Sequence, residues 1–375
     1  MKHLLLIQSL LLSLFLFGQK ESSLNKKDSH LLITGYDFKN NGKSLSKNKM
    51  TTIFEEDTTI NKTVIANNLN LIEALKVNLA YLKRKGNKNA SSLKGLSYNY
   101  QDLLRANQCL LNEHLDTVDF SKLHLQKIWG EDQKGNVLYT SYYIPIVDVR
   151  LVKDSTFRFP IHKKPNTKYL KGLTRKSIDQ KKMLYGKNLE LAYAKSYFDI
   201  YSMQVQGSAY VRFKNGATNL FSYGGMNNKP YFSIGKYLTN TGAIAKDKIS
   251  LQSIDAWFKS NPDSMNILMK NQSYIYFKKS DKKPTGAAGI PLVNFVSVAC
   301  DFKYLPKGSI LLGEVPVLDS YGNLIKHEYR ILIAQDTGGA IKGPGHVDLY
   351  AGVGSKAGDY AGKIKHYGRL WLILP

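Results

Sequence analysis

The spacing of hydrophobic residues divides the chain into a helical part followed by a strand-rich part. From Val64 to Lys85 apolar residues recur at steps of three and four, which predicts an amphipathic helix with Gly86 just beyond its end. A second helix is predicted from Tyr100 to Glu113. From Asn136 to Arg150 the pattern NVLYTSYYIPIVDVR is instead typical of a strand. We expect the helix faces to pack against a core and to carry no chemistry.

Short strand-like runs dominate the remainder of the chain. The segment YFDIYSMQVQGSAYVRF, residues 197–213, begins with aromatic residues and ends as an alternating strand. The stretch 248–279 predicts helix, turn, helix and strand in that order. Farther on, apolar runs at 315–318, 329–334 and 370–374 are bounded by Gly and Pro. Several short strands with turn signals between them predict a small β-barrel.

The stretch from Gln335 to Trp371 is rich in glycine, which indicates tight turns and close backbone approaches. It contains two aspartates with apolar neighbours: Asp336 follows the run YRILIAQ, and Asp348 lies in HVDLY. A carboxylate at the end of a buried strand is poorly hydrated, so its pKa is expected to rise. A general acid that works near neutral pH needs such a shift.

Four segments in this stretch, DTGGAIKG, HVDLY, AG and HYGRLW, resemble in their order the three-aspartate domain of lytic murein transglycosylases. In particular, they are similar to the membrane-bound lytic murein transglycosylase A family. The resemblance maps the trio onto Asp301 (in ACDFKYLPKGS), Asp336 and Asp348, and it places the catalytic acid/base on Asp348. The segment between the second and third aspartates is one residue longer than the family pattern.

Two earlier segments extend the resemblance. Residues 139–145, YTSYYIP, are similar to a family strand in which Gly and Thr stand where this chain has Ser141 and Ile144. The segment VQGSA resembles the family's Val-Gln-Gly-Ser-Gly, whose glutamine amide can both donate to and accept from a sugar. The substrate-binding residues implied by the resemblance are Gln206, Gly207, Ser208, Tyr143 and Lys342, with Asp301 supporting.

Several of these side chains have a second interpretation. Asp336 either raises the pKa of Asp348 by like-charge repulsion or caps the following Gly-rich turn. Gln206 lines a groove or lies on the surface at a β-bulge. Lys342 binds substrate carboxylates, lowers the pKa of nearby carboxyl groups, or is simply solvated. His346 is expected on the same strand face as Asp348, although a lone histidine is more often a packing or surface residue.

The resemblance also implies the architecture. We expect a mainly β fold with flanking helices: a double-psi β-barrel domain with a second, smaller β-domain inserted and a groove between them. The barrel domain, with the N-terminal helices, would comprise 60–150 and 241–375, including the three-aspartate domain at 297–375. The inserted domain would comprise 151–240. We predict a signal peptide at 1–18 and a flexible tether at 19–59.

The composition restricts the partners. The formal net charge is +24, from 53 Lys and Arg against 29 Asp and Glu, which suits an anionic polymer. Much of the excess is attributed to a Lys- and Asn-rich surface. No zinc spacing, RNA-binding aromatic signature or basic heptad region is present, so nucleic acid is disfavoured. No dinucleotide glycine loop or His-x-x-x-His pair is present either, so we predict no cofactor and no metal.

The N-terminus MKHLLLIQSLLLSLFLFGQKESS is typical of a secretory signal, because a charged start precedes a short apolar run. We therefore expect an exported, periplasmic protein, with outer-membrane association in question because no cysteine lies where a lipid anchor would attach. The only cysteines, Cys109 and Cys300, either pair in an oxidising compartment or remain buried thiols. We expect a monomer.

The resemblance implies a carbon–oxygen lyase acting on a polysaccharide. Asp348 would cleave the bond between N-acetylmuramic acid and N-acetylglucosamine, first as acid and then as base, leaving a 1,6-anhydromuramoyl end in cell-wall turnover. The expected partners are peptidoglycan glycan strands, with association to the envelope or to other cell-wall enzymes. Two alternatives stay open: a non-catalytic carbohydrate-binding module, and a two-carboxylate glycoside hydrolase on the same barrel.

Overall fold

The computed structural model describes residues 53–66, 69–93, 96–130, 135–246 and 248–375. The predicted signal peptide and most of the predicted tether lie outside these residues. Of the predicted tether, residues 53–59 are described, and they include β1 (Phe54–Glu56), which pairs antiparallel with β6 (His124–Ile128). Trp371 anchors the next turn, since its indole Nε1 donates to Asp57 Oδ2 at 2.9 Å. Within the described residues, no helix has the length and apolar character to cross a membrane.

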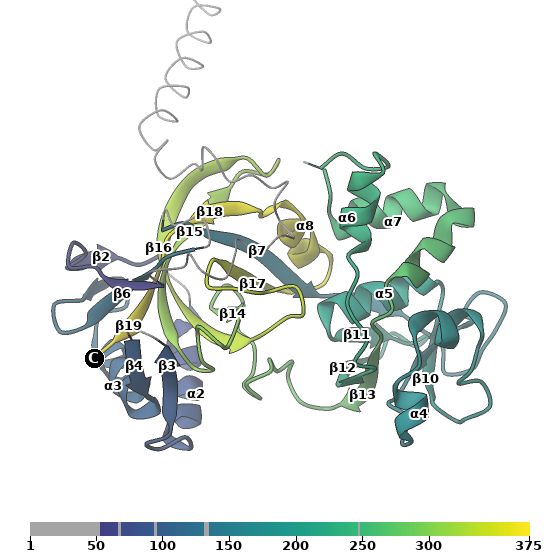
Figure 1. The fold of residues 1–375 in the computed structure, drawn as a ribbon, viewed down its shortest axis with the longest axis horizontal. Helices are drawn as coiled ribbons and strands as arrows, with labels where there is room; N and C mark the ends of the chain where they lie inside the picture. Colours follow the sequence, from purple (N-terminus) through teal and green to yellow (C-terminus); the bar gives the residue numbers. More distant parts are fainter. Residues whose placement is uncertain (1–52, 67–68, 94–95, 131–134, 247) are drawn as a thin grey trace, which may run out of the picture.

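The largest sheet of the described residues has nine strands in the order β1-β6-β19-β15-β16-β14-β17-β7-β18 (Figure 1). Apolar residues at 310–312 and 331–333 alternate between two buried clusters, one on each face of the sheet, whereas residues 324–330 are exposed or only partly buried. Beyond β1 and β6, its strands are β7 (Val137–Ile144), β14 (Ser297–Ala299), β15 (Ile310–Leu318), β16 (Leu324–Asp336), β17 (His346–Val353), β18 (His366–Gly368) and β19 (Leu370–Leu374).

The sheet curls because two consecutive strands of the C-terminal segment pair with different strands of the sheet. Strand β18 pairs with β7, while β19, which follows after the single residue Arg369, pairs with β15. The crossing is tight, since a Cβ on Gly368 would lie 2.0 Å from the carbonyl oxygen of Glu314. The described strands form no closed barrel, because β1 and β18 are the two edge strands of the sheet and are not hydrogen-bonded to each other. The predicted mainly β class with flanking helices is confirmed.

Two helices cover one side of this sheet. Helix α3 (Tyr100–Asn112) starts where predicted, because the Asn99 side chain caps it together with Asp102. Helix α2 (Leu71–Lys83) starts later than predicted, since Val64, the first residue of the predicted helix, lies in β2 (Lys62–Val64), which pairs with β5 (Thr117–Asp119). The remaining strands on this side are β3 (Asn89–Leu93) and β4 (Leu96–Asn99), and helix α8 (Ser355–Lys363) lies near β7 and β17.

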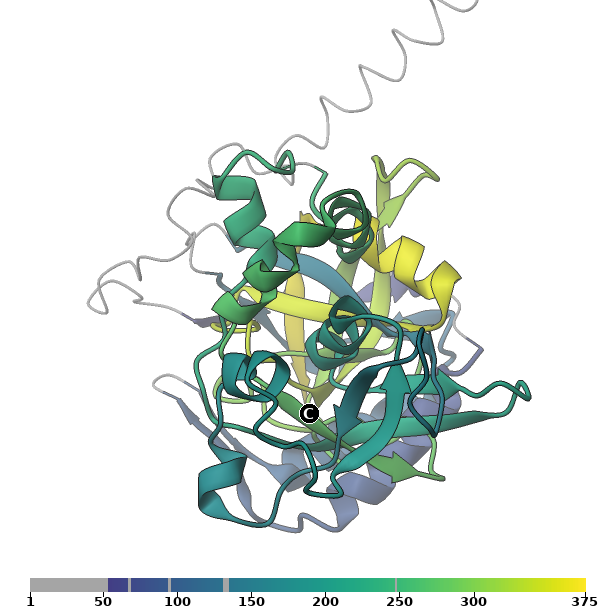
Figure 2. The same cartoon turned by 90° about the vertical axis from the view of Figure 1, so that its right-hand side faces the viewer.

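A second unit lies beside the first and is built around a four-stranded sheet in the order β13-β12-β11-β8 (Figures 1 and 2). Its strands are β8 (Ile146–Asp148), β9 (Phe159–His162), β10 (Glu190–Ala194), β11 (Ala209–Arg212), β12 (Thr218–Met226) and β13 (Ile275–Ser280). Its helices are α4 (Lys168–Lys171), the π-helix η2 (Lys176–Gln180), α5 (Tyr197–Gln206), α6 (Ile234–Asn240), α7 (Leu251–Ser260) and the 3-10 helix η3 (Pro262–Lys270).

The boundaries of the second unit differ from the predicted 151–240. Strands β8 and β13 belong to its sheet although they lie outside that range, and η3 takes the place of the second predicted helix. Helices α6 and α7 share one apolar cluster with α5. We therefore propose that the unit extends from Ile146 to Ser280. The two cysteines are free thiols, so the disulfide alternative is not realised.

Candidate active site

Two neighbouring parallel strands carry the candidate acid and its partner. In the pairing of β17 with β7, Asp348 lies opposite Thr140 and Tyr350 lies opposite Tyr142. Residues two apart on a strand share a face, so these four side chains form one patch. The Thr140 hydroxyl donates to Asp348 Oδ1 at 2.6 Å. The centroids of the two tyrosine rings are 5.4 Å apart.

Asp348 is largely shielded from water by the strands around it. This burial raises its pKa from the ordinary value of 3.8 to about 7. The Thr140 hydrogen bond acts in the opposite direction, because it favours the ionised form, and the negative charge of Asp336 raises the pKa further. The shift expected for a poorly hydrated carboxylate is therefore found at this position. Near neutral pH, Asp348 is poised between its protonated and ionised forms.

Asp336 ends β16 and has both carboxylate oxygens engaged. Its Oδ1 accepts from the backbone N–H groups of Ala287 and Thr337, each at 2.9 Å, and its Oδ2 accepts from the Tyr142 hydroxyl at 2.9 Å. Burial raises the pKa of Asp336, while these three hydrogen bonds lower it. Both interpretations of Asp336 therefore have structural support: it bonds to the turn that follows, and its charge raises the pKa of Asp348.

His346 shares the patch with Asp348, as strand alternation predicts. Its Nε2 lies 2.9 Å from the Thr140 hydroxyl oxygen. Burial lowers the pKa of His346 to about 4, so the ring is neutral at physiological pH. A hydroxyl has a single proton, and Thr140 gives it to Asp348, so the consistent tautomer has His346 Nε2–H donating to Thr140. The three side chains thus form one hydrogen-bonded row.

The patch lies where the two units meet. Tyr142 and Tyr350 belong to an apolar cluster with Ala299 and Ile341, and the partly buried ring of Tyr210 on β11 packs against it. The backbone N–H of Tyr210 donates to the Pro145 carbonyl at 2.9 Å, which joins the second sheet to the end of β7. The candidate acid therefore has residues of both units around it.

Gln206 and Gly207 lie on a helix end, not on a strand or β-bulge. Gln206 is the last residue of α5, and Gly207 ends the helix with φ 80°, a left-handed conformation that favours glycine. The Gln206 side chain is tied to β7, because its Oε1 accepts from the Tyr143 backbone N–H at 3.0 Å. Ser208 is partly buried between this cap and β11. The Tyr143 ring lies against α8, where a Cβ on Gly358 would meet it at 2.9 Å.

The other predicted site residues lie at the adjoining loops. Asp301 is bonded to backbone: Oδ1 accepts from Lys303 N at 3.1 Å and Oδ2 from Gly343 N at 3.0 Å. It thereby holds the loop between β16 and β17, as expected of a structural residue. Lys342 in the same loop is exposed. Two surface pockets, one beside Asp148 and one beside Glu73, lie on the described residues. Neither is lined by Asp336 or Asp348, so the groove between the two units stays a prediction.

Sequence reasoning missed two members of the patch. Thr140 and Tyr142 were part of a strand motif without a role, yet they hold Asp348 and Asp336 respectively. Hydroxyl side chains occupy every position from 139 to 143, so the strand motif by itself did not single out Thr140 and Tyr142. No sequence motif indicated that the loop around Ala287 contributes to the site. Within the described ranges, no group of three or more His, Cys, Asp or Glu side chains is placed to hold a metal ion.

Comparisons with known proteins agree with this geometry. The family model for the MltA-specific insert domain matches residues 138–278, and that for the 3D domain matches residues 296–374. Membrane-bound lytic murein transglycosylase A of Vibrio cholerae is 41% identical over 250 residues, which cover 65% of this chain and 67% of the relative. The Escherichia coli K12 protein of that name is 38% identical over 253 residues, with the same two coverages.

Solved structures extend the similarity to nearly the whole described chain. Escherichia coli MltA with bound chitohexaose superposes with a TM-score of 0.72 at 30% identity, covering 88% of this chain and 97% of that one. The membrane-bound lytic murein transglycosylase of Agrobacterium tumefaciens gives a TM-score of 0.69 at 25% identity, with coverages of 81% and 92%. The sequence segments, the fold and the order of the two units all agree. The chain therefore belongs to the membrane-bound lytic murein transglycosylase A family of enzymes.

Proposed function

We propose that this enzyme cleaves peptidoglycan glycan strands at the bond between N-acetylmuramic acid and N-acetylglucosamine, with Asp348 as the single acid and base. The observation that carries the proposal is the environment of Asp348: burial raises its pKa to about 7, and one of its oxygens is held by Thr140. A related structure with bound chitohexaose supports an oligosaccharide ligand. This activity requires that the protein be exported and act in the cell envelope.

The reaction needs one carboxyl group used twice. Protonated Asp348 gives its proton to the glycosidic oxygen as the bond from C1 to that oxygen breaks. The C6 hydroxyl of the same muramic acid residue then attacks C1, and the Asp348 carboxylate takes the hydroxyl proton. No water is added, so the product carries a 1,6-anhydro ring. A carboxyl group with a pKa near 7 suits both steps, because its protonated and its ionised form are both populated near neutral pH.

The neighbours of Asp348 have positioning roles in this scheme. Thr140 donates to Oδ1, so the proton to be transferred resides on Oδ2. Neutral His346 keeps the Thr140 hydroxyl oriented, since its Nε2 contacts the same oxygen. Gln206 uses its amide oxygen on Tyr143 and keeps its NH₂ group for a sugar acetamido or hydroxyl oxygen. Gly207 ends the helix directly after Gln206, so that the chain can turn into β11.

The state of Asp336 favours this lyase over a two-carboxylate hydrolase. A hydrolase needs a second carboxylate free to attack the sugar or to activate a water. Both oxygens of Asp336 are instead taken up by Ala287, Thr337 and Tyr142. We assign Asp336 a supporting electrostatic role, Asp301 a structural role in the loop, and Lys342 a contact with substrate carboxylates.

Mass spectrometry of digested sacculi tests the proposal. The wild-type chain is expected to release muropeptides that are lighter by one water than hydrolytic products. Asp348→Asn keeps the shape of the side chain but cannot supply the proton, so anhydro products should disappear while the fold, checked by circular dichroism, persists. Products with reducing ends would point to a hydrolase, and unchanged product release by the variant would refute the role of Asp348.

A further inference from the structure

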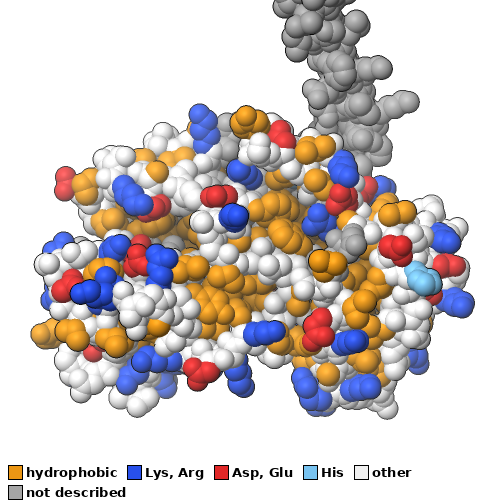
Figure 3. All heavy atoms as spheres, turned by 180° about the vertical axis from the view of Figure 1, so that it is seen from behind, with side chains coloured by type: hydrophobic (Ala, Val, Ile, Leu, Met, Phe, Trp, Pro, Cys, Tyr) orange, Lys and Arg blue, Asp and Glu red, His pale blue; other side chains and the backbone are white. Residues whose placement is uncertain are grey.

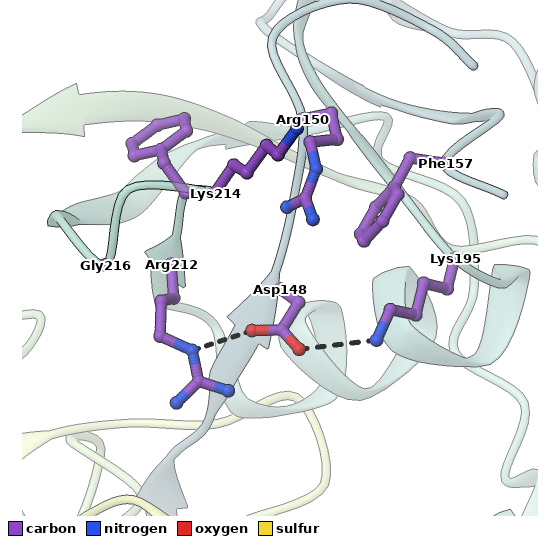
Figure 4. A pocket seen from close by; sticks show the side chains of 8 residues that line it. Asp148, Arg150, Phe157, Lys195, Arg212, Lys214 and Gly216 are labelled. Carbon is purple, nitrogen blue, oxygen red and sulfur yellow. Dashed lines mark hydrogen bonds and ion pairs between the residues drawn. The ribbon is translucent and has the colours of Figure 1, made fainter.

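A surface pocket of about 350 Å³ lies on the second unit, at the end of β8 and the start of the β11–β12 hairpin (Figure 4). It takes no part in the chemistry proposed above. Its lining is dominated by cations, with Phe157 and Phe213 contributing aromatic rings. The four cationic side chains that line it are Arg150, Lys195, Arg212 and Lys214.

The carboxylates at this pocket already accept hydrogen bonds from other groups of the protein. Asp148 accepts from Arg212 Nε at 2.7 Å and from Lys195 Nζ at 3.3 Å, one on each oxygen (Figure 4). Asp154 accepts from the backbone N–H groups of Phe157 and Thr156, which lower its pKa, and the nearby cations Arg150 and Lys214 lower it further. Four cations against two carboxylates leave a net charge of +2 at the pocket.

Several donors here have no acceptor within the part of the chain that the structure describes. Arg212 uses only Nε for Asp148, so both of its Nη groups are free. Arg150 donates Nη1 to the Val149 carbonyl and stacks its guanidinium over Phe157 at 4.1 Å, which holds the group in place. Lys214 makes no hydrogen bond or ion pair there. A guanidinium fork with free donors matches the oxygens of a phosphate.

Two exposed apolar residues directly follow Arg150. Leu151 is 61% exposed and Val152 is 77% exposed, whereas the apolar side chains on the strands β8, β9 and β10 themselves are buried or partly buried apart from Ile146. The loop continues with the exposed Lys153. Single exposed apolar residues are common, but an adjacent pair beside a cationic pocket is the pattern of a loop that dips into a lipid interface.

We propose that this pocket and loop 150–158 form a docking site for anionic phospholipid, with the headgroup phosphate at Arg212, Arg150 and Lys214 and with Leu151 and Val152 among the acyl chains. Both features are needed to explain the surface: a free phosphate or a peptide carboxylate would leave the exposed apolar pair without a function. A neutral surface would leave the free cationic donors unused. The site lies on the second unit, so it would hold that unit towards a membrane surface.

Vesicle co-sedimentation of the full chain tests the site. We expect binding to phosphatidylglycerol-containing vesicles and weak binding to pure phosphatidylcholine. The double variant Arg212→Gln/Lys214→Gln should weaken the partition about tenfold to thirtyfold, since each cation at an anionic surface contributes roughly a factor of five. Leu151→Ser/Val152→Ser should weaken it about tenfold through lost apolar burial. Lys214→Gln alone, which breaks no hydrogen bond or ion pair of the described residues, covers the case in which the double variant is unstable.

Matched control variants distinguish binding at this site from nonspecific effects of net charge and of exposed apolar surface. Arg105→Gln removes one exposed arginine from α3 of the other unit, and Leu69→Ser removes an apolar side chain that is 92% exposed there. Neither should change the partition by more than about twofold. Hydrogen–deuterium exchange of loop 150–158 in the same samples reports contact at the site itself, whatever other part of the chain meets the vesicle.

The outcomes divide cleanly. Protection of the loop by anionic vesicles, lost in both site variants and kept in both controls, supports the site. Unchanged exchange of the loop in the presence of vesicles overturns it. Equal loss in the Arg105 control would mean a nonspecific charge effect, and competition by inorganic phosphate without any vesicle binding would mean a site for free phosphate. Each of those two results also overturns the proposal.

Discussion

The environment of Asp348 predicts how the stability of the protein changes with pH. Burial raises the pKa of this carboxyl from 3.8 to about 7 in the folded chain. Between these two values the unfolded chain ionises the group while the folded chain keeps it protonated. The folded state therefore binds more protons, and its free energy of unfolding falls as the pH rises through this window. The contribution is fully present below pH 3.8 and is lost above pH 7.

The size of this effect follows from the shift. One pKa unit corresponds to about 1.4 kcal/mol, so ionising Asp348 in the folded chain costs about 4 kcal/mol in total. Asp348→Asn removes the titration and leaves the neighbours in place. The free energy of unfolding of the variant, minus that of the wild type, should therefore rise by about 3 kcal/mol between pH 4.5 and pH 8.

Urea unfolding followed by tryptophan fluorescence measures this difference, because Trp371 is fully buried in the folded chain. His346 and His162 titrate in the same range with the opposite sign, since burial lowers the pKa of each to about 4. Their contributions cancel in the comparison of variant with wild type as long as the substitution leaves them unchanged. A difference that stays constant from pH 4.5 to pH 8 would show that Asp348 is not kept from water, and the argument for its acid role would fail.

Three further substitutions test the neighbours. Asp336→Asn removes the charge that raises the pKa of Asp348, so the alkaline limb of the pH–activity profile should move to lower pH; a limb that stays in place contradicts this coupling. Thr140→Val should move that limb to higher pH and lower kcat about tenfold to a hundredfold, with Thr140→Ser restoring both in steady-state assays. Gly207→Ala should lower the free energy of unfolding by about 1 kcal/mol, because its φ is 80°, although open space surrounds the position; equal urea midpoints would show that the cap tolerates a Cβ.

Helices and strands could be predicted where residues close together in the sequence determine them. The start of α3 follows from Asn99 and Asp102, whose capping pattern is readable in the sequence, and β19 was predicted with the bounds that it has. The start of α2 could not be predicted, because Val64 and Ile65 fit the apolar spacing of a helix, and only the pairing of β2 with β5 places Val64 in a strand. Gln206 was misassigned for a different reason: VQGSA reads as a strand, although the local capping pattern of Ser196 and Asp199 starts a helix that ends at Gly207.

The candidate site shows the same division. The sequence by itself determined that two aspartates sit at apolar strand positions in a glycine-rich C-terminal stretch, and that one of them is the candidate acid. Which groups face that acid depended on pairing between β7 and β17, whose paired residues lie about two hundred positions apart in the chain. No local pattern encodes such a register. Only the tertiary structure could therefore decide that Thr140 holds Asp348 and that Tyr142 holds Asp336, because burial and strand pairing together determine the partners of each carboxylate.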